Sequence, residues 1–276
     1  MKKKLAAIPK WVPAVLSMIL WIGILVLLWE MGARKMDATK RTPENILPPL
    51  KNIWNALISS KKVAGGKTAI QVVMSGAGMT LLRALYGFIA GSVLGFGLAL
   101  IMKLSGIVEK LIFPYLMLIQ MIPILGMAPI ILSITGDINV SRVIIAGILT
   151  FYPVATNTLA GFNAVEREKY ELMYTYAASK ATIYRKVLIP YSIPYFFTGL
   201  KIAAPMAITA SILVDTLQGD GGLGCILSQS LKHAMSIYVF WIIVFFSALI
   251  GILSSRIMGW LEILILPNKR KRRKRA

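Results

Sequence analysis

Long apolar runs alternate with shorter polar breaks along the whole chain. A membrane-spanning helix needs about 20 consecutive apolar residues, and six of these runs can supply one. The pattern therefore predicts an all-α integral membrane protein with six transmembrane helices. The expected spans are residues 12–31, a span within 69–103, then 111–135, 143–162, 195–217 and 237–257, the last extended to Pro267 by an interfacial segment.

The second and third expected spans carry residues that ordinary helix interiors disfavour. Gly87, Gly91 and Gly95 follow one another at four-residue spacing in the second span. This spacing allows close helix–helix approach, and packing is the interpretation we favour. The third span is interrupted by prolines, which free backbone carbonyls that protein groups or a wet cavity must satisfy. These are Pro114, Pro123 and Pro129.

The polar breaks have their own patterns. Between the first two spans, Ile46-Leu47-Pro48-Pro49 indicates a stiff turn, and residues 50–60 a short amphipathic helix. Residues 218–236 are predicted to be a glycine-rich loop. Within it, residues 219–224 lack the lysine and the strand–helix context of a phosphate-binding loop, so a turn is expected there.

Basic residues are distributed unevenly between the two sides that six spans create. The side of the termini receives eighteen Lys and Arg, and the opposite side ten. Cytoplasmic loops carry the excess of basic residues, so both termini are expected to be cytoplasmic. The expected division is a cytoplasmic N-terminus (1–11), a permease domain (12–267) and a basic cytoplasmic tail (268–276). The first opposite-side segment, residues 32–67, is basic against this trend, with eight Lys and Arg.

Composition supports a membrane protein and excludes several other classes. The chain is 57% hydrophobic and 15% charged, with a net charge of +20. Because the basic residues flank apolar runs, they indicate contact with anionic lipid, and no nucleic-acid partner is expected. With a single Cys225 and a single His233, neither a disulfide within the chain nor a metal site is predicted. The basic start resembles a signal peptide, but its apolar stretch is long and no cleavage pattern follows, so a retained span is expected.

Catalytic chemistry is not supported by the sequence. Most of the 11 acidic residues lie in loops or at span ends, and no pair has the spacing for acid–base work within a span. No Gly-x-x-x-x-Gly-Lys-[Ser/Thr] motif is present. The chain is therefore not expected to be an enzyme or to hold a cofactor, and an ATP motor would have to be another chain.

The break at residues 163–194 is the most informative part of the sequence. It reads as two short helices with polar and apolar faces, which could lie on the membrane surface or enter a groove of a partner. Here the chain resembles the binding-protein-dependent ABC importer permeases, which carry a cytoplasmic Glu-Ala-Ala-x-x-x-Gly loop closed by Leu-Pro. The residues that fall on this motif are Glu171, Leu172, Met173, Ala177 and Pro190, and Ser179 lies between the last two. Leu172 and Met173 replace the two alanines, Ala177 replaces the glycine, and Ile189 replaces the leucine.

Further fragments resemble the nitrate/sulfonate/taurine-type members of this family. They are Ile46-Leu47-Pro48-Pro49, residues 80–88, Ile122-Pro123, Ala128-Pro129, Gly199-Leu200-Lys201-Ile202 and Gly222-Leu223-Gly224. The resemblance implies a type I importer permease in the plasma (inner) membrane. It also implies partners: a second permease copy, a cytoplasmic ATPase dimer that docks on the loop and binds ATP, and an extracytoplasmic substrate-binding protein.

Polar groups within spans are candidates for the translocation path. Gln120 and Met121 precede Pro123 in the third span, Asn157 lies in the fourth, and Asp215 lies near the end of the fifth. Each has a structural alternative: Gln120 and Asn157 could form hydrogen bonds between helices, and Asp215 could cap an interface or shape an outer gate. Arg83 could pair with an acid or a headgroup. A neutral Gln120 favours a small organic solute over nitrate among the sulfonate, taurine, nitrate, bicarbonate and thiamine-precursor substrates of such permeases.

Other functions compete with the importer interpretation. A membrane scaffold would turn its polar residues outward, whereas a transporter gathers prolines and polar residues around a cavity. A secondary transporter usually has intramembrane acids or an inverted repeat. A membrane-embedded enzyme is opposed by the few acids and the single histidine.

Overall fold

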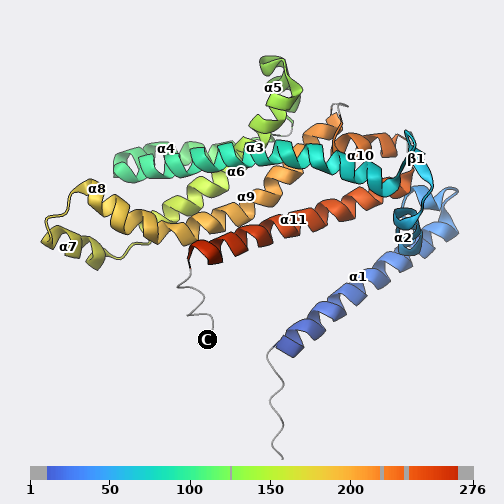
Figure 1. The fold of residues 1–276 in the computed structure, drawn as a ribbon, viewed down its shortest axis with the longest axis horizontal. Helices are drawn as coiled ribbons and strands as arrows, with labels where there is room; N and C mark the ends of the chain where they lie inside the picture. Colours follow the sequence, from blue (N-terminus) through green and yellow to red (C-terminus); the bar gives the residue numbers. More distant parts are fainter. Residues whose placement is uncertain (1–10, 125, 218–220, 233–235, 267–276) are drawn as a thin grey trace, which may run out of the picture.

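The computed structural model describes residues 11–124, 126–217, 221–232 and 236–266. Its long helices lie side by side in an elongated bundle with two ends (Figure 1). At one end lie α7 (Arg167–Thr175) and the last turns of α11 (Ile237–Ile265); we call it the α7 end. The other carries α2 (Leu50–Ile58) and the two-stranded hairpin of β1 (Lys62–Ala64) and β2 (Lys67–Thr68); we call it the hairpin end.

Five helices in the described residues are long and apolar enough to cross a membrane. They confirm five of the six expected spans: α1 (Trp11–Thr39), α3 (Ala69–Leu104), α6 (Ile138–Asn163), α9 (Ile189–Leu217) and α11. With 36 residues, α3 is about 54 Å long at 1.5 Å per residue. It exceeds a hydrocarbon core of about 30 Å, so it must tilt or extend beyond the core.

The third expected span is not one continuous helix. The prediction of a single span over residues 111–135 was wrong in this respect, because the chain there forms α4 (Gly106–Met121) and α5 (Ala128–Thr135). α4 ends next to Ile122-Pro123, where proline offers no N–H and disfavours a helical conformation in the residue before it. α5 starts again at Ala128-Pro129, where proline in the first helical turn costs nothing. Figure 1 shows α5 standing away from the direction of α4.

The glycine series of the second span is a packing surface, as the sequence predicted. A Cβ built on Gly87 would lie 2.5 Å from the Ala146 Cβ, and one on Gly95 2.7 Å from the Phe151 carbonyl oxygen. The backbones of α3 and α6 therefore touch at positions where no side chain fits. This contact joins the two helices at the centre of the bundle.

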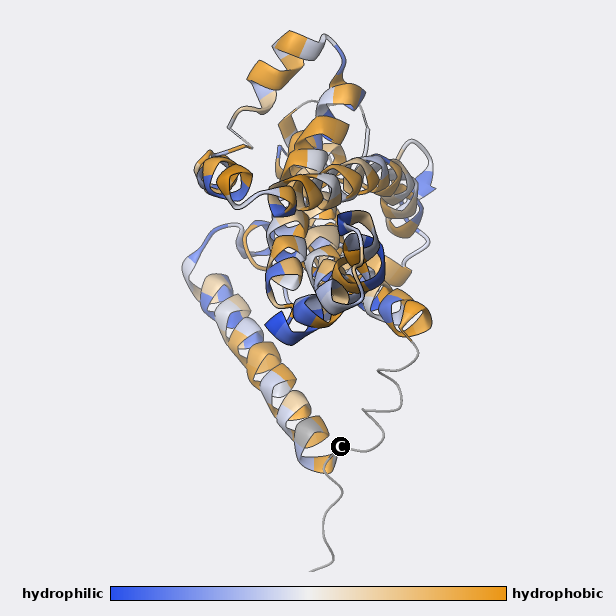
Figure 2. Ribbon diagram, turned by 90° about the vertical axis from the view of Figure 1, so that its left-hand side faces the viewer, coloured by the Kyte–Doolittle hydropathy of each residue, from blue (hydrophilic) through white to orange (hydrophobic). Residues whose placement is uncertain are grey.

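α1 is set apart from the other spans. Its most apolar stretch has no buried residue, and Figure 2 shows it as a largely apolar helix standing away from the bundle. It is held near its second half, where the Trp29 ring lies edge-on to Trp241 at 4.7 Å and the Trp29 Nε1 donates to the Pro48 carbonyl at 3.0 Å. The helix runs past the expected end at residue 31 to Thr39. An apolar helix with this exposure faces lipid or another chain.

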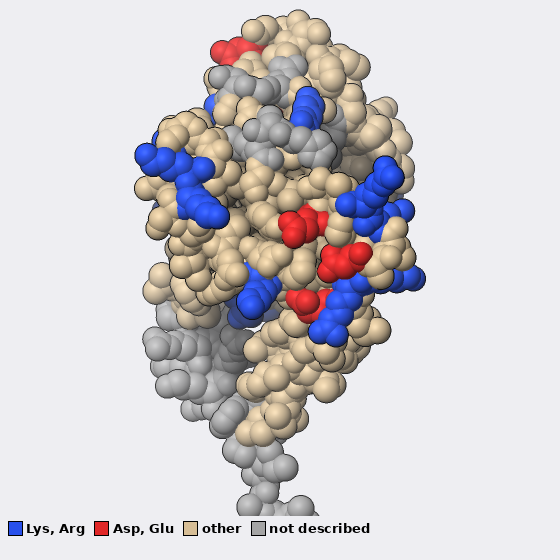
Figure 3. Space-filling view, turned by 90° about the vertical axis from the view of Figure 1, so that its right-hand side faces the viewer, with Lys and Arg blue, Asp and Glu red and all other residues tan. Residues whose placement is uncertain are grey.

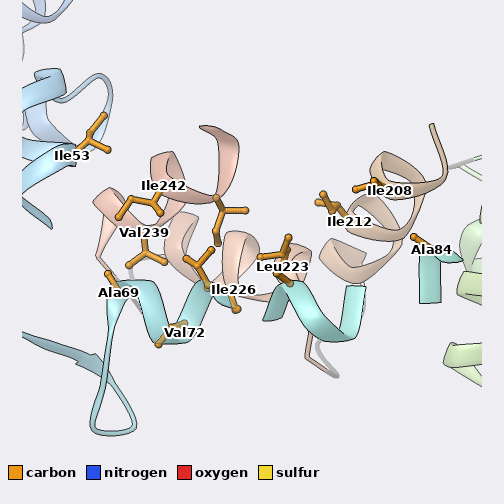
Figure 4. Close-up of a cluster of buried hydrophobic side chains, with 13 residues drawn as sticks. Ile53, Ala69, Val72, Ala84, Ile208, Ile212, Leu223, Ile226, Val239 and Ile242 are labelled. Atoms are coloured by element: carbon orange, nitrogen blue, oxygen red, sulfur yellow. The ribbon is translucent and has the colours of Figure 1, made fainter. Parts of the chain in front are cut away.

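The hairpin end has a core of its own. Buried apolar side chains of α2, α3, α9 and α11 converge there on the helix α10 (Leu223–Leu231), as Figure 4 shows. The short 3-10 helix Pro43–Asn45 precedes α2. The prediction of a loop over residues 218–236 was wrong for this stretch, because α10 packs into the core through Leu223 and Ile226. The remaining expected features of that loop, His233 and residues 218–220, lie outside the described residues, as do the two termini.

Candidate functional site

The helix α7 gives the loop of residues 163–194 a packed face and an open face. Tyr170 and Met173 pack against a buried cluster formed by α3, α4, α6 and residues of the loop that precedes α9. Burial raises the pKa of the Tyr170 hydroxyl, so this group is neutral where it packs. The open face presents Leu172, which is 56% exposed, and Tyr176, which is 76% exposed. Large apolar groups in water on a polar loop are typical of a protein-binding surface.

Glu171 lies on this open face. Its carboxylate accepts a hydrogen bond from the Arg167 Nε at 2.9 Å, but both side chains are largely exposed. Such an i,i+4 pair contributes only about 0.3–0.5 kcal/mol. The carboxylate is therefore free to exchange Arg167 for a donor on another protein at little cost.

The end of α7 has an unusual backbone. Ala177 has a φ of +50°, the only positive φ of a non-glycine residue in the described chain. The Ala178 N–H donates to the Met173 carbonyl at 3.0 Å, and the Ala177 N–H to the Tyr174 carbonyl at 2.9 Å. These two bonds form a Schellman motif, which normally has glycine at the left-handed position. Ala177 thus occupies a glycine conformation at the position where the resembling permeases have their motif glycine.

Replacing Ala177 with glycine is expected to stabilise the end of α7. A left-handed residue with a Cβ costs about 1–2 kcal/mol relative to glycine. The hydrogen exchange of the Ala177 and Ala178 amides should therefore slow by about fivefold, the equivalent of about 1 kcal/mol. Ala178→Gly is the matched control and should exchange faster, because it adds only chain entropy. Faster exchange in Ala177→Gly would contradict the strain argument.

The second half of the loop is tied to the bundle. Ser179 caps α8 (Lys180–Ile183) by accepting a hydrogen bond from the Thr182 N–H. A π-helical turn over Tyr184–Leu188 leads into α9, with the Ile189 N–H bonded to the Tyr184 carbonyl. This widened turn comes just before Pro190, which has no N–H and whose ring displaces the preceding turn. The Tyr184 hydroxyl donates to the Lys103 carbonyl at 2.7 Å, so the loop is hydrogen-bonded to the end of α3.

The candidate path residues do not form one site within this chain. Gln120, Met121 and Pro123 are exposed together at the break between α4 and α5. Asn157 is half-buried inside α6 and donates to the Pro153 carbonyl at 2.7 Å, beside Gly199 of α9. Asp215 is fully buried elsewhere, in a cluster of charges.

Asp215 is the centre of that buried cluster. Its carboxylate lies 2.7 Å from the Arg142 Nε and 3.4 Å from an Arg83 nitrogen, and it accepts a hydrogen bond from the Thr80 hydroxyl at 2.8 Å. Arg83 therefore pairs with an acid, one of the two expected alternatives. Sequence patterns did not assign Arg142 or Thr80 to such a cluster, because Arg142 falls between two expected spans and threonine is common within spans. The cluster ties α3, α6 and α9 together near the hairpin end.

Two glycines bring α10 onto this cluster. A Cβ on Gly222, whose φ is +95°, would lie 2.1 Å from the Asp215 Oδ2. One on Gly224 would lie 1.9 Å from the Ile212 carbonyl oxygen. The Leu223 N–H donates to the Thr80 hydroxyl at 2.9 Å, so a single threonine joins α3, α9 and α10. Gly222-Leu223-Gly224 is needed for this close approach.

A second ion pair, between a partly exposed lysine and a buried carboxylate, joins α9 to α11. The Lys201 ammonium contacts the Glu262 carboxylate, and Glu262 is 6% exposed. No sequence pattern connects these two residues. They are 61 positions apart, and only the antiparallel packing of α9 and α11 brings them together. The pair places a positive charge beside a negative one within two apolar spans.

These features define a class: a multi-pass membrane bundle that carries a helix with an exposed face on a loop between two spans. The family described as "Binding-protein-dependent transport system inner membrane component" matches residues 91–265. Since this is more than half of the chain, the protein belongs to that family. The resemblance found in the sequence is thereby confirmed.

Known proteins agree with this membership. The chain is 28% identical over 252 residues to the formylaminopyrimidine transport permease protein ThiX of Halalkalibacterium halodurans, covering 91% of this chain and 95% of that one. It is 24% identical over 262 residues to the nitrate import permease protein NrtB of Synechocystis sp., covering 94% and 92%. The crystal structure of an amino acid ABC transporter with histidines matches with a TM-score of 0.59 at 22% identity, over 70% of this chain and 94% of that one, which shows the shared fold.

The protein is therefore the inner-membrane permease component of a binding-protein-dependent ABC importer, and is not itself an ATPase. Permeases of this family work with an ATPase and a substrate-binding protein.

Proposed function

We propose that two copies of this chain form the translocation path, and that a dimeric cytoplasmic ATPase docks on the open face of α7. ATP is bound by that partner, while an extracytoplasmic binding protein delivers the solute at the hairpin end. The α7 end is then cytoplasmic, with both termini on that side. The observation that carries the proposal is α7 itself, which packs on the bundle through one face and presents Glu171, Leu172 and Tyr176 on the other.

A sixth crossing by α4 and α5 is part of this proposal. α3 reaches the α7 end, where Lys103 bonds to Tyr184. α6 starts near the hairpin end, where Arg142 meets Asp215, which also accepts a hydrogen bond from Thr80. The chain between them must pass from one end to the other. The two short helices, broken at Pro123, make this passage and leave Gln120 and Met121 on an exposed surface facing the path.

An uncharged path favours an uncharged or zwitterionic organic solute over nitrate. From Leu111 to Thr135 the chain contains no charged residue, and Lys201 on α9 is already paired with Glu262. A path for a small inorganic anion would need a free cation to replace its hydration. We therefore propose a solute like that named for the formylaminopyrimidine permease. The substrate-binding protein that purifies with this chain should show a rise in Tm when a formylaminopyrimidine is added. A rise in Tm with nitrate alone would overturn the proposed solute.

Affinity purification tests the coupling. The tagged chain, extracted in detergent, should bring down an ATPase and a substrate-binding protein identified by mass spectrometry. Glu171→Lys should lower ATPase recovery by about tenfold or more, because truncating or reversing a charge at an interface costs about 2–5 kcal/mol. Asp37→Lys, at the far end of α1, makes the same charge change and should leave recovery unchanged. Clean recovery of the chain without any ATPase would refute the proposal.

A further inference from the structure

The hairpin end carries a concentration of positive charge that the topology rule does not explain. Residues 32–67 contain eight Lys and Arg and only two acids, Asp37 and Glu44. On the proposed outer side such an excess opposes the positive-inside preference. Glu44 is already engaged, since its carboxylate accepts a hydrogen bond from the Tyr238 hydroxyl at 2.6 Å. The positive charge therefore needs another reason.

The β-hairpin places part of this charge on a rigid support. Lys62 pairs with Thr68 across the two strands, and the turn is made by Gly65 and Gly66, both with positive φ. Thr68 also begins α3 through a capping box with Gln71. The hairpin therefore leads directly into α3, the longest helix of the bundle, with no flexible linker between them. A surface of this kind is preorganised for binding.

Three lysines of the hairpin segment are free to bind a partner. Lys61, Lys62 and Lys67 are exposed, and none of them forms an ion pair within the part of the chain that the structure describes. Figure 3 shows Lys and Arg side chains on both flanks of this end of the molecule, with acidic ones between them and at its upper edge. The lysines lie at the end of the bundle, and not on the sides that face lipid.

Two open grooves lie on either side of the hairpin. The first, of about 730 Å³, is lined by Lys61 and Lys62 with polar groups of α2 and the start of α11. The second, of about 440 Å³, is lined by Lys67 with residues of α3 and α10. Hollows of this size accept the side chains of a folded partner, whereas a layer of lipid headgroups would meet the rim of the bundle. The second groove also includes Gly222, so an occupant would touch the element that covers Asp215.

The geometry points to residues 61–68 and their two flanking grooves as the docking surface for an acidic face of the substrate-binding protein. This rests on the proposed function for its assignment of the outer side. Acidic side chains of the partner meet Lys61, Lys62 and Lys67, while the grooves receive the residues around them. Electrostatic complementarity of this type sets orientation and association rate and is strongest at low salt.

The test compares two sets of charge reversals. The assembled transporter is placed in nanodiscs of phosphatidylcholine, and its Kd for the binding protein identified by mass spectrometry is measured. The triple variant Lys61→Glu, Lys62→Glu, Lys67→Glu should bind about tenfold or more weakly at about 0.1 M KCl and within about threefold of the parent at about 1 M, where the Debye length falls from about 10 Å to about 3 Å. A triple Lys→Gln variant at the same positions should be intermediate.

The control variant makes the same change in net charge at the same end of the molecule. Arg34→Glu, Lys35→Glu, Lys40→Glu changes exposed residues that line neither groove and should alter the Kd by less than about twofold. Equal weakening by both triples, or by neither, overturns the proposal. An effect confined to nanodiscs that contain phosphatidylglycerol overturns it in favour of lipid headgroups. If ATPase recovery depends on Glu171 but the hairpin variants bind normally, the proposed function stands and this inference fails.

Discussion

Replacing Asp215 with asparagine is expected to destabilise the protein by about 3–5 kcal/mol, because it leaves buried arginines without their carboxylate. Arg142 has a fully buried side chain and Arg83 one that is 15% exposed, so water cannot replace the lost partner at Arg142. The Thr80 hydroxyl would also lose its charged acceptor, which weakens the contact of α10. Thermal unfolding of the purified chain in detergent should show a large drop in Tm.

Two further variants identify the cause of that drop. Asp137→Asn is the matched control, since Asp137 caps α6 at an exposed site and asparagine caps a helix equally well. Its Tm should change little. Combining Asp215→Asn with Arg142→Met removes the guanidinium that has lost its carboxylate and should recover part of the loss. An Asp215→Asn protein as stable as the parent would show that the cluster does not hold the helices together.

Replacing Gly91 with leucine is expected to prevent α3 and α6 from packing. A Cβ at this position would lie 2.4 Å from the Gly147 carbonyl oxygen and 2.7 Å from the Thr150 Cβ. Both obstacles belong to α6, and the nearest is backbone, so no side-chain rotation relieves the clash. The helices must move apart, at a cost of about 3 kcal/mol or more. Size-exclusion chromatography in detergent should show a loss of monodisperse protein.

Gly78→Leu is the control for that experiment. Gly78 lies on the same helix, is exposed, and has nothing within 4 Å of its would-be Cβ. Gly78→Leu adds the same side-chain volume as Gly91→Leu and removes the same conformational freedom of a glycine. We expect a monodisperse protein with a Tm close to that of the parent. If Gly91→Leu behaves like Gly78→Leu, the α3–α6 contact is looser than the structure shows.

The loop of residues 163–194 shows how much residue spacing alone can predict. The positions of Glu171, Ala177 and Pro190 follow from the motif, although four residues differ from it. What the spacing could not reveal is that Ala177 adopts the left-handed conformation that alanine resists, held by two Schellman hydrogen bonds. Met173 and Tyr170 on the same helix also pack on the bundle, and that packing is a property of the folded chain.

The third span shows why hydropathy is a weaker guide at prolines. Its apolar composition is sufficient for a membrane span, and its three prolines indicate that the helix is interrupted. Whether a proline kinks a helix or ends it depends on what neighbouring helices offer to the freed backbone groups. Here Pro123 ends α4, and the chain turns before α5 begins.

The sequence by itself determined the class of protein, five of the long helices and the small-residue face of α3, because span length and residue spacing are local properties. It also identified the family through motifs that keep their order along the chain. Only the tertiary structure decided which charges meet. Arg83, Arg142 and Asp215 come from three helices, and Lys201 and Glu262 from two. A buried charge is stable inside a membrane only beside an opposite charge. Helix packing determines which two charges meet, and local sequence patterns do not predict that packing.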